Sequence, residues 1–375
     1  MWNFRVLCFA LLLCVSGMPL RAQAMSVVFL NPGKSDEIYW VTVTHSMEAA
    51  AHNLGIRLEV IYAERNHLLT LEQARTIAAR PQQTRPDYVI ATNDHAMASE
   101  VVRILDAAHI KTFLAFSGIS EAWQREQMGV PRKIYKGWLG SLEPHAEDAG
   151  YMTAKALIEQ GRQAKKYGPD GKIHMLVIAG DRSSTTSLKR NQGMRDAVAE
   201  AKDVVIDQEV YGEWSRRRAY EQSSWLYKRY PAAALIWAGN DLMALGAMES
   251  WRDHGGKPGT DGFFSGINTF SEAFIALESG TLTALAGGHF IAGAFALVML
   301  YDYHHGRDFA DEGTELDRPM VILFRPQEAK RFRQLFARLN DDNADFRRFS
   351  KVLNPSVKTY DFSLRRLLNQ TERVR

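Results

Sequence analysis

The sequence predicts an α/β protein made of two successive lobes, each with a parallel sheet covered by helices on both faces. Two observations lead to this fold class. Strand and helix patterns alternate along the chain in two series of similar size, with no low-complexity linker between them. The interior strands are short apolar runs, such as residues 232–237 between Pro231 and Gly239, which are typical of strands buried on both faces. Two such lobes are expected to meet at a cleft.

The first series begins after Met25. Its strands are expected at residues 26–30, 57–62, 87–91, 112–116 and 135–140, and its helices at 40–54, 71–79 and 96–108. The second series is expected to contain a helix at about 145–160, strand 173–179, helix 188–201, strand 204–210, helix 217–230, strand 232–237 with the helix after it, and strand 262–267. A buried helix rich in Ala and Gly follows at 290–303, and a final strand at 319–324.

Length and composition fit two cores in one soluble chain. The 375 residues are 46% hydrophobic and 24% charged, enough to fill two ordinary domains. The formal net charge of +3 is too small to indicate nucleic acid as a partner.

Residues 1–24 have the pattern of a secretory signal peptide. Arg5 supplies the positive start, residues 6–15 form an apolar run too short to span a bilayer, and Ala22-Gln23-Ala24 is a small-x-small cleavage site. A retained membrane anchor or lipoprotein is the alternative, although Cys14 after three leucines is a poor acylation context. We expect cleavage after Ala24, which removes both cysteines and places a soluble, thiol-free protein in a periplasm.

A candidate site follows the strand at 232–237. Asn240 and Asp241 stand where this strand ends and a helix starts, and in open α/β sheets ligands bind at such strand ends, beside exposed helix amides. The alternative is that both residues only cap the helix.

Four local patterns occur in one order along the chain. They are Asn31 to Trp40, Arg190-Asn-Gln-Gly193-Met194, Gly239 to Gly246, and Ser265-Gly-Ile-Asn268 with the residues up to Thr281-Leu-Thr-Ala. Over about residues 26–325 the chain resembles the type I periplasmic sugar-binding proteins, the ribose- and galactose-binding proteins and their relatives. This resemblance implies two doubly wound, Rossmann-like lobes joined by three hinge crossovers. It divides the chain into residues 25–140 with about 289–318, residues 141–288 with about 319–326, and an extension at 327–375.

The resemblance implies aromatic walls on both lobes. Tyr39 and Trp40 match the family's paired stacking aromatics, with a hydrophobic staple at the helix start as the alternative. Trp214 matches the aromatic of the opposite lobe, with a surface tryptophan as the alternative. Sugar-like ligands present apolar faces and a ring of hydroxyls, so flat aromatics and multivalent polar groups suit them.

It also implies polar ligand contacts. Arg190 matches an arginine whose fork can hold two oxygens, and Asn240 matches a ligand-binding amide, while Asp241 is expected to cap. Asn268 stands where many relatives have aspartate. In the first lobe Asn93 and Asp94 follow a strand, where capping is an equal alternative.

The chain departs from the family pattern at two places. Phe116 and Ser117 stand where many sugar-binding relatives carry Asp-Arg, and His289 stands near the hinge where glutamine is common. His289 is expected either to bind ligand or to serve as a structural residue at the crossover. These changes put an ordinary hexose or ribose in doubt and leave a modified sugar or an autoinducer-2-like signal equally open.

The extension is basic, with twelve Lys or Arg against six acids (12 − 6 = +6) over residues 327–375. A basic helical tail can dock a membrane protein or an anionic surface. The alternative, favoured for its first half, is a helix packed on the second lobe through Phe332, Leu335, Phe336 and Leu339.

Together these features predict a periplasmic, monomeric receptor that closes on a sugar-like molecule by hinge motion and delivers it to an ABC transporter permease. The alternative is a signal-transduction receptor that regulates a membrane histidine kinase or cyclase. No cofactor, metal or nucleic acid is expected. Enzymatic motifs such as Gly-x-Ser-x-Gly or a Walker loop do not occur in the sequence, so catalysis is not expected.

Overall fold

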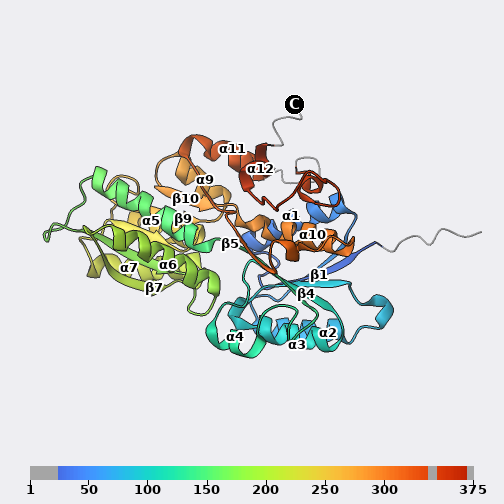
Figure 1. Ribbon diagram of the computed structural model, residues 1–375. Coiled ribbons are helices and arrows are strands. Elements are labelled where there is room, and N and C mark those ends of the chain that lie inside the picture. Colours follow the sequence, from blue (N-terminus) through green and yellow to red (C-terminus); the bar gives the residue numbers. More distant parts are fainter. Residues whose placement is uncertain (1–23, 337–343, 370–375) are drawn as a thin grey trace, which may run out of the picture.

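The computed structural model describes residues 24–336 and 344–369, and the chain forms two α/β lobes side by side (Figure 1). Most of the expected leader, residues 1–23, therefore lies outside the described residues. Each lobe has a six-stranded sheet, with strand order β11-β5-β4-β3-β1-β2 in the first and β12-β10-β9-β8-β6-β7 in the second. The strands of the first sheet are all parallel, and only β12 runs antiparallel in the second. The expected fold class is confirmed.

The first lobe is built from the strands β1 (Ser26–Asn31), β2 (Arg57–Tyr62), β3 (Tyr88–Ala91), β4 (Lys111–Ala115), β5 (Trp138–Pro144) and β11 (Glu315–Arg318). Its helices are α1 (Ile38–Leu54), α2 (His67–Ala78), α3 (Ala98–Ala107), α4 (Ala122–Met128) and α10 (Ala292–His304). Alternate residues of β1 feed two cores, because Phe29 packs in the cluster that contains α1 and α10 while Val28 packs in the cluster with α2 and α3. The sheet is thus covered on both faces.

The second lobe repeats this arrangement. Its strands are β6 (Ile173–Ala179), β7 (Val204–Tyr211), β8 (Leu235–Ala238), β9 (Phe263–Ile267), β10 (Ala284–Gly287) and β12 (Ile322–Leu323). Its helices are α5 (Ala146–Gln163), α6 (Thr185–Glu200), α7 (Arg216–Arg229), α8 (Asp241–Asp253) and α9 (Ser271–Glu278). Figure 1 shows α5, α6 and α7 around this second sheet.

The chain crosses between the lobes three times. It leaves the first lobe after β5, returns after β10 through the 3-10 turn η3 (His289–Ile291), and leaves again between β11 and β12. The strand expected at 135–140 lies three to four residues later, since residues 135–137 form the turn before β5. The strand expected at 319–324 is reduced to β12.

Beyond β12 the chain continues as α11 (Pro326–Phe336), the 3-10 turn η5 (Phe346–Phe349) and α12 (Leu364–Asn369). Another 3-10 turn, η4 (Phe309–Asp311), lies earlier, between α10 and β11. Where a helical extension was expected, the described residues 350–363 form turns and irregular backbone. Across the described residues, no helix is both long enough and apolar enough to traverse a bilayer.

Two glycines set the distance between α5 and α6. A Cβ built on Gly193 would lie 1.9 Å from the backbone oxygen of Glu147, and one built on Gly150 would lie 1.9 Å from the backbone oxygen of Arg190. Backbone therefore meets backbone at this crossing, and the contact fixes the position of α6 in the lobe.

We predict that Gly193→Ala lowers the free energy of unfolding by about 1–3 kcal/mol, the usual cost of overpacking. Alanine favours a helix interior by up to about 1 kcal/mol, but the neighbouring backbone cannot yield to the added methyl group. Urea unfolding measures the change, with Gln192→Ala on the exposed side of the same helix as the control. A Gly193→Ala protein as stable as the control would show that the helices separate freely.

Candidate functional site

A cavity of about 100 Å3 lies between the lobes, at the carboxyl ends of both sheets. Its walls come from both lobes and from the crossing after β10. All ten sequence-predicted site residues line it: Tyr39, Trp40, Asn93, Asp94, Phe116, Arg190, Trp214, Asn240, Asn268 and His289. The topology explains this convergence, because parallel strands end at one edge of each sheet and the two edges face each other.

The first lobe supplies an aromatic wall. Trp40 is only 7% exposed, and its ring lies 5.5 Å from the ring of Phe116 and 6.3 Å from that of Phe29. Trp40 is therefore part of the core as well as of the cavity wall, and its buried indole nitrogen has no hydrogen-bond partner in the part of the chain that the structure describes. The adjacent Tyr39 stacks on His289 at 5.1 Å between ring centroids.

Trp214 forms the opposing wall on the second lobe. It lies in a tight turn after β7 in which Glu213 and Trp214 both have left-handed backbones (φ 51° and 59°). The ring packs so closely on Gly180 that a Cβ there would lie 2.2 Å from it. The indole nitrogen donates to Asp181 Oδ2 at 2.8 Å. Burial alone would raise the pKa of the Asp181 carboxyl, yet hydrogen bonds from Ser184 and its neighbour hold that pKa below its usual value.

Arg190 projects from the first turns of α6 into the centre of the site. One terminal nitrogen donates to the Gly239 carbonyl at 2.8 Å, and the other donates to His289 Nε2 at 2.9 Å. Nε is buried and has no hydrogen-bond partner among residues 24–336 and 344–369. Burial lowers the pKa of this guanidinium to about 10, which leaves it charged at neutral pH. No carboxylate lies within ion-pair distance of Arg190 among the described residues. A desolvated cation in this state needs hydrogen-bond acceptors from elsewhere.

His289 is neutral and its tautomer follows from Arg190. Burial, aided by the Arg190 charge, moves the pKa of His289 well below its usual value. Since a guanidinium can only donate, Nε2 of the ring accepts and Nδ1 carries the proton. That Nδ1 is also buried without a hydrogen-bond partner in the described part of the chain. The ring thus lies at the crossing after β10 and contacts both lobes.

Asn240 and Asp241, at the start of α8, have different hydrogen-bond partners. Asn240 Oδ1 caps the helix by accepting from the Met243 amide at 2.8 Å, and its Nδ2 donates to the Trp214 carbonyl at 3.3 Å. Asp241 accepts from the Phe270 amide at 2.9 Å and from Asn268 Nδ2 at 3.3 Å. Asp241 therefore ties the turn after β9 to α8 and orients the Asn268 amide toward the cavity wall.

Asn93 and Asp94 differ in how they are used. The amide of Asn93 is buried, and its Nδ2 donates to the Gly118 carbonyl at 3.0 Å and to Gln124 Oε1 at 2.8 Å. Asp94 lies next to it in a turn where His95 has a left-handed backbone. Burial raises the pKa of the Asp94 carboxyl, and the nearby Arg65 opposes that rise.

Sequence reasoning missed a charged pair at the cavity. Arg65 donates from Nε to Glu37 Oε2 at 2.8 Å and forms a second ion pair with the other oxygen, and both residues line the cavity beside Trp40. Arg65 lies in the turn that follows β2, so the strand-end rule that singled out Asn93 applies to it as well. Glu37, in contrast, carries no such signal, because it precedes α1 without capping it.

The lobes also touch at the mouth of the cavity. His95 Nδ1 of the first lobe lies 3.0 Å from Ser183 Oγ of the second. The lobes therefore touch in this structure, and we call this arrangement closed. No group of three or more His, Cys, Asp or Glu among the described residues is placed to hold a metal ion.

Comparisons with known proteins agree with this geometry. Residues 27–308 match the model of the periplasmic binding protein domain. A crystal structure of a periplasmic sugar-binding protein from Pseudomonas fluorescens is 37% identical, with 92% of this chain and 99% of that one covered and a TM-score of 0.80. No curated protein matches the chain.

More distant structures share the fold. A galactofuranose-binding protein is 17% identical (84% of this chain and 99% of that chain covered, TM-score 0.69). The binding protein of the arabinose ABC transporter from Shewanella sp. ANA-3, bound to α- and β-L-arabinofuranose, is 19% identical (84% and 98%, TM-score 0.70).

The buried Asp241 carboxyl predicts a pH dependence of stability. Burial raises its pKa from 3.8 to about 6, against the hydrogen bonds from Phe270 and Asn268. The folded protein therefore holds this proton to higher pH than the unfolded chain, so the stability contributed by protonation is lost as the pH rises from about 4 to 6. The shift of roughly two units corresponds to at most about 3 kcal/mol.

We predict that the free energy of unfolding of the native protein falls, relative to that of Asp241→Asn, between pH 4 and pH 6 and stays level above that range. Urea midpoints of both proteins across pH 4 to 8 measure the difference, and the shared titrations of all other groups cancel. Parallel curves over the whole range would contradict the raised pKa.

Proposed function

This chain belongs to the periplasmic binding protein family, and we propose on that premise that it captures a small sugar between its lobes and delivers it to a membrane permease. The proposal includes export through the leader at residues 1–24, cleavage after Ala24 and residence in the periplasm. The 37% identical relative, a periplasmic sugar-binding protein, supports the ligand class.

One observation carries the proposal: a charged, desolvated Arg190 lies in a cavity walled by aromatic rings from both lobes. Its contacts with the Gly239 carbonyl and His289, the two hydrogen bonds of its side chain among the described residues, use only part of its five N–H groups. A neutral polyol can accept from the terminal N–H groups that remain, because each hydroxyl can accept from nitrogen while donating to a carbonyl or carboxylate. Its C–H faces match the rings of Tyr39 and Trp214.

The size of the cavity favours a monosaccharide. One water needs roughly 10–15 Å3 by the same measure, so about 100 Å3 accommodates roughly seven to ten heavy atoms. A pentose, with its five carbons and five oxygens, lies at the upper end of this range. Furanose sugars are the first candidates, since fold relatives are described with bound arabinofuranose and fucofuranose.

Charge balance argues for a neutral ligand. Arg65 is neutralised by Glu37, and Arg190 faces the buried Asp241 across the site without pairing with it. Asp94 and Asp181 add negative charge near the mouth. A sugar acid would therefore meet two carboxylates as well as the guanidinium, whereas an uncharged sugar meets no net repulsion.

Hinge closure then transmits occupancy to the partner. A ligand stabilises the closed form only to the extent that it binds that form better than the open one. Residues from both lobes line the cavity, so a sugar can contact all of them only when the lobes are closed. The permease would recognise the closed surface. The proposed role is binding and release, so the sugar is expected to be recovered unchanged after incubation with the protein.

We predict that a panel of neutral monosaccharides, including L-arabinose, D-galactose, D-ribose and D-allose, contains at least one sugar that raises the melting temperature. A ligand that binds only the folded state raises the free energy of unfolding by RT ln(1 + [L]/Kd), and the melting temperature rises with it. Differential scanning fluorimetry measures the shift, and calorimetry gives the dissociation constant. If only sugar acids or amino acids raised the melting temperature, the proposed ligand class would be wrong.

We predict that Arg190→Met weakens binding of that sugar by about 10- to 100-fold, the range for losing a hydrogen bond to a charged group. Stability should change little, by at most about 2 kcal/mol, because methionine removes the cost of a buried charge while the Gly239 carbonyl loses its donor. Arg195→Met is the matched control, since Arg195 lies on the same helix but pairs with Glu209 at the surface. Equal affinity of both variants would place the ligand elsewhere.

A further inference from the structure

The C-terminal extension contacts both lobes. Its first helix, α11, packs on α9 of the second lobe, where the Phe332 ring lies 4.8 Å from that of Phe324 and Arg333 lies 3.7 Å from Glu278. Its later part, from Ala344 onward, packs on α1 and α10 of the first lobe. In Figure 1 the extension runs along one side of the molecule, with α11 and α12 next to each other.

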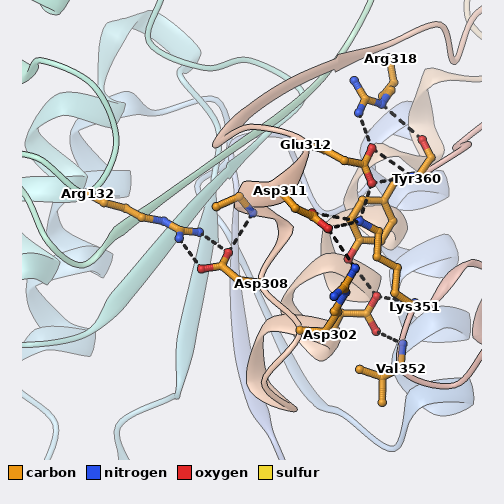
Figure 2. A network of polar contacts seen from close by, with 11 residues as sticks. Arg132, Asp302, Asp308, Asp311, Glu312, Arg318, Lys351, Val352 and Tyr360 are labelled. Atoms are coloured by element: carbon orange, nitrogen blue, oxygen red, sulfur yellow. Dashed lines mark hydrogen bonds and ion pairs between the residues drawn. The ribbon is translucent and has the colours of Figure 1, made fainter. Parts of the chain in front are cut away.

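Asp302 at the end of α10 anchors the later part to the first lobe (Figure 2). This carboxylate is fully buried and accepts from the Lys351 amide at 2.7 Å, the Tyr360 hydroxyl at 2.9 Å and the Val352 amide at 3.2 Å, as well as from the Ser350 hydroxyl. Because several donors converge on the Asp302 carboxylate, they hold residues 350–360 in one position against the first lobe.

A second set of charges extends this anchor to the hinge. The Lys351 ammonium, on a side chain 1% exposed, lies 3.0 Å from Asp311 and 2.6 Å from Glu312. Glu312 also pairs with Arg318 at 2.8 Å, and Arg318 Nε donates to the Tyr360 carbonyl at 3.3 Å (Figure 2). Arg318 is the last residue of β11, so this hydrogen bond joins the extension to the crossing that leads to β12.

The helix α12 lies on another crossing. Leu364 is 1% exposed and packs on Gly288, where an added Cβ would lie 2.5 Å from Leu364 Cδ2 and 2.7 Å from the Met320 carbonyl oxygen. Arg365 reaches back to Glu328 of α11 at 4.0 Å. Leu364 therefore packs on the crossing at Gly288, and Gly288 in turn lies against the Met320 carbonyl of another crossing.

The residue after Gly288 is His289, which stacks on Tyr39 of the first lobe and bonds Arg190 of the second. A residue that holds Gly288 in place therefore also positions His289, which contacts both lobes at the cavity. In the same structure His95 and Ser183 close the mouth of the cavity.

We propose that the extension is a hinge clasp, in which Leu364 of α12 acts as a positioning residue that holds the crossing at Gly288, and through Gly288 its contact with the crossing at Met320, in the closed arrangement. The clasp favours closure before ligand arrives, so it raises the fraction of binding-competent protein. The clasp proposal rests on the proposed function only in that closure of the lobes is the motion that captures sugar. Part of the basic charge of the extension is accordingly paired inside the molecule, at Lys351.

The test measures the separation of the lobes without any sugar. Spin labels on Glu126→Cys in α4 and Arg217→Cys in α7, both exposed sites, report the distance between the lobes by pulsed electron paramagnetic resonance. Native cysteines occur only at positions 8 and 14, so a chain that starts at Met25 carries no others. We expect a population at the short, closed separation, and a closed-to-open ratio at least about 5-fold lower in Leu364→Ala, the lower end of typical coupling between sites.

Three comparisons make the result decisive. Leu364→Met should restore the native distance distribution, because methionine can refill the contact on Gly288. Leu353→Ala, on an extension residue that is 44% exposed, should leave the distribution native. If Leu364→Ala does not fold, a chain that ends at Ser363 takes its place. Coinciding distributions for the native protein and the folded variant would overturn the clasp, and would leave the sugar-binding proposal untouched because no sugar is present.

Discussion

The arrangement of the cavity depends on the position of one desolvated guanidinium, that of Arg190. Arg190 is 5% exposed, keeps its charge and has no carboxylate partner within ion-pair distance in the described chain. Isolated buried charges are costly, so such a group persists only where the surroundings hold it rigidly and a function requires it. Here the surroundings are the Gly239 carbonyl at the end of β8 and the neutral His289 ring at a crossing between the lobes. Each of these contacts belongs to a different part of the fold.

The rest of the scaffold follows from holding that side chain in place. The backbone contact between α5 and α6 at Gly150 and Gly193 fixes the helix from which Arg190 projects. The left-handed turn at Trp214 and the Asp181 hydrogen bond fix the ring that lies 5.6 Å from the guanidinium carbon. On the hinge side, the extension packs Leu364 against Gly288. His289 thus belongs both to the cavity wall, where it contacts Arg190, and to the hinge, where it follows Gly288. Burial and the neighbouring guanidinium lower its pKa and keep it uncharged.

Sequence reasoning reached the fold and most of the cavity because both depend on local signals. Apolar runs followed by Asn, Asp or aromatic residues mark strand ends, and parallel topology brings all strand ends together, so all ten predicted residues line one cavity. The strands β10 and β11 were missed because Ala284–Gly287 lacks β-branched residues and Glu315–Arg318 is an edge strand with only Leu316 buried. Contacts that span long separations, such as Ser350 with Asp302 or Leu364 with Gly288, leave no periodic pattern. The alternatives left open at Asn93 and Asn240 also needed coordinates, which show both amides engaged in the turns that shape the cavity.

The central claim is that the Arg190 guanidinium binds an oxygen of a neutral sugar. The most direct measurement is a crystal structure of the protein with the tightest-binding monosaccharide. The account predicts a sugar oxygen about 3 Å from a terminal nitrogen of Arg190, with the sugar ring beside the Trp214 and Tyr39 rings. A sugar bound outside this cavity, or bound within it with no oxygen at hydrogen-bond distance from Arg190, would contradict the account.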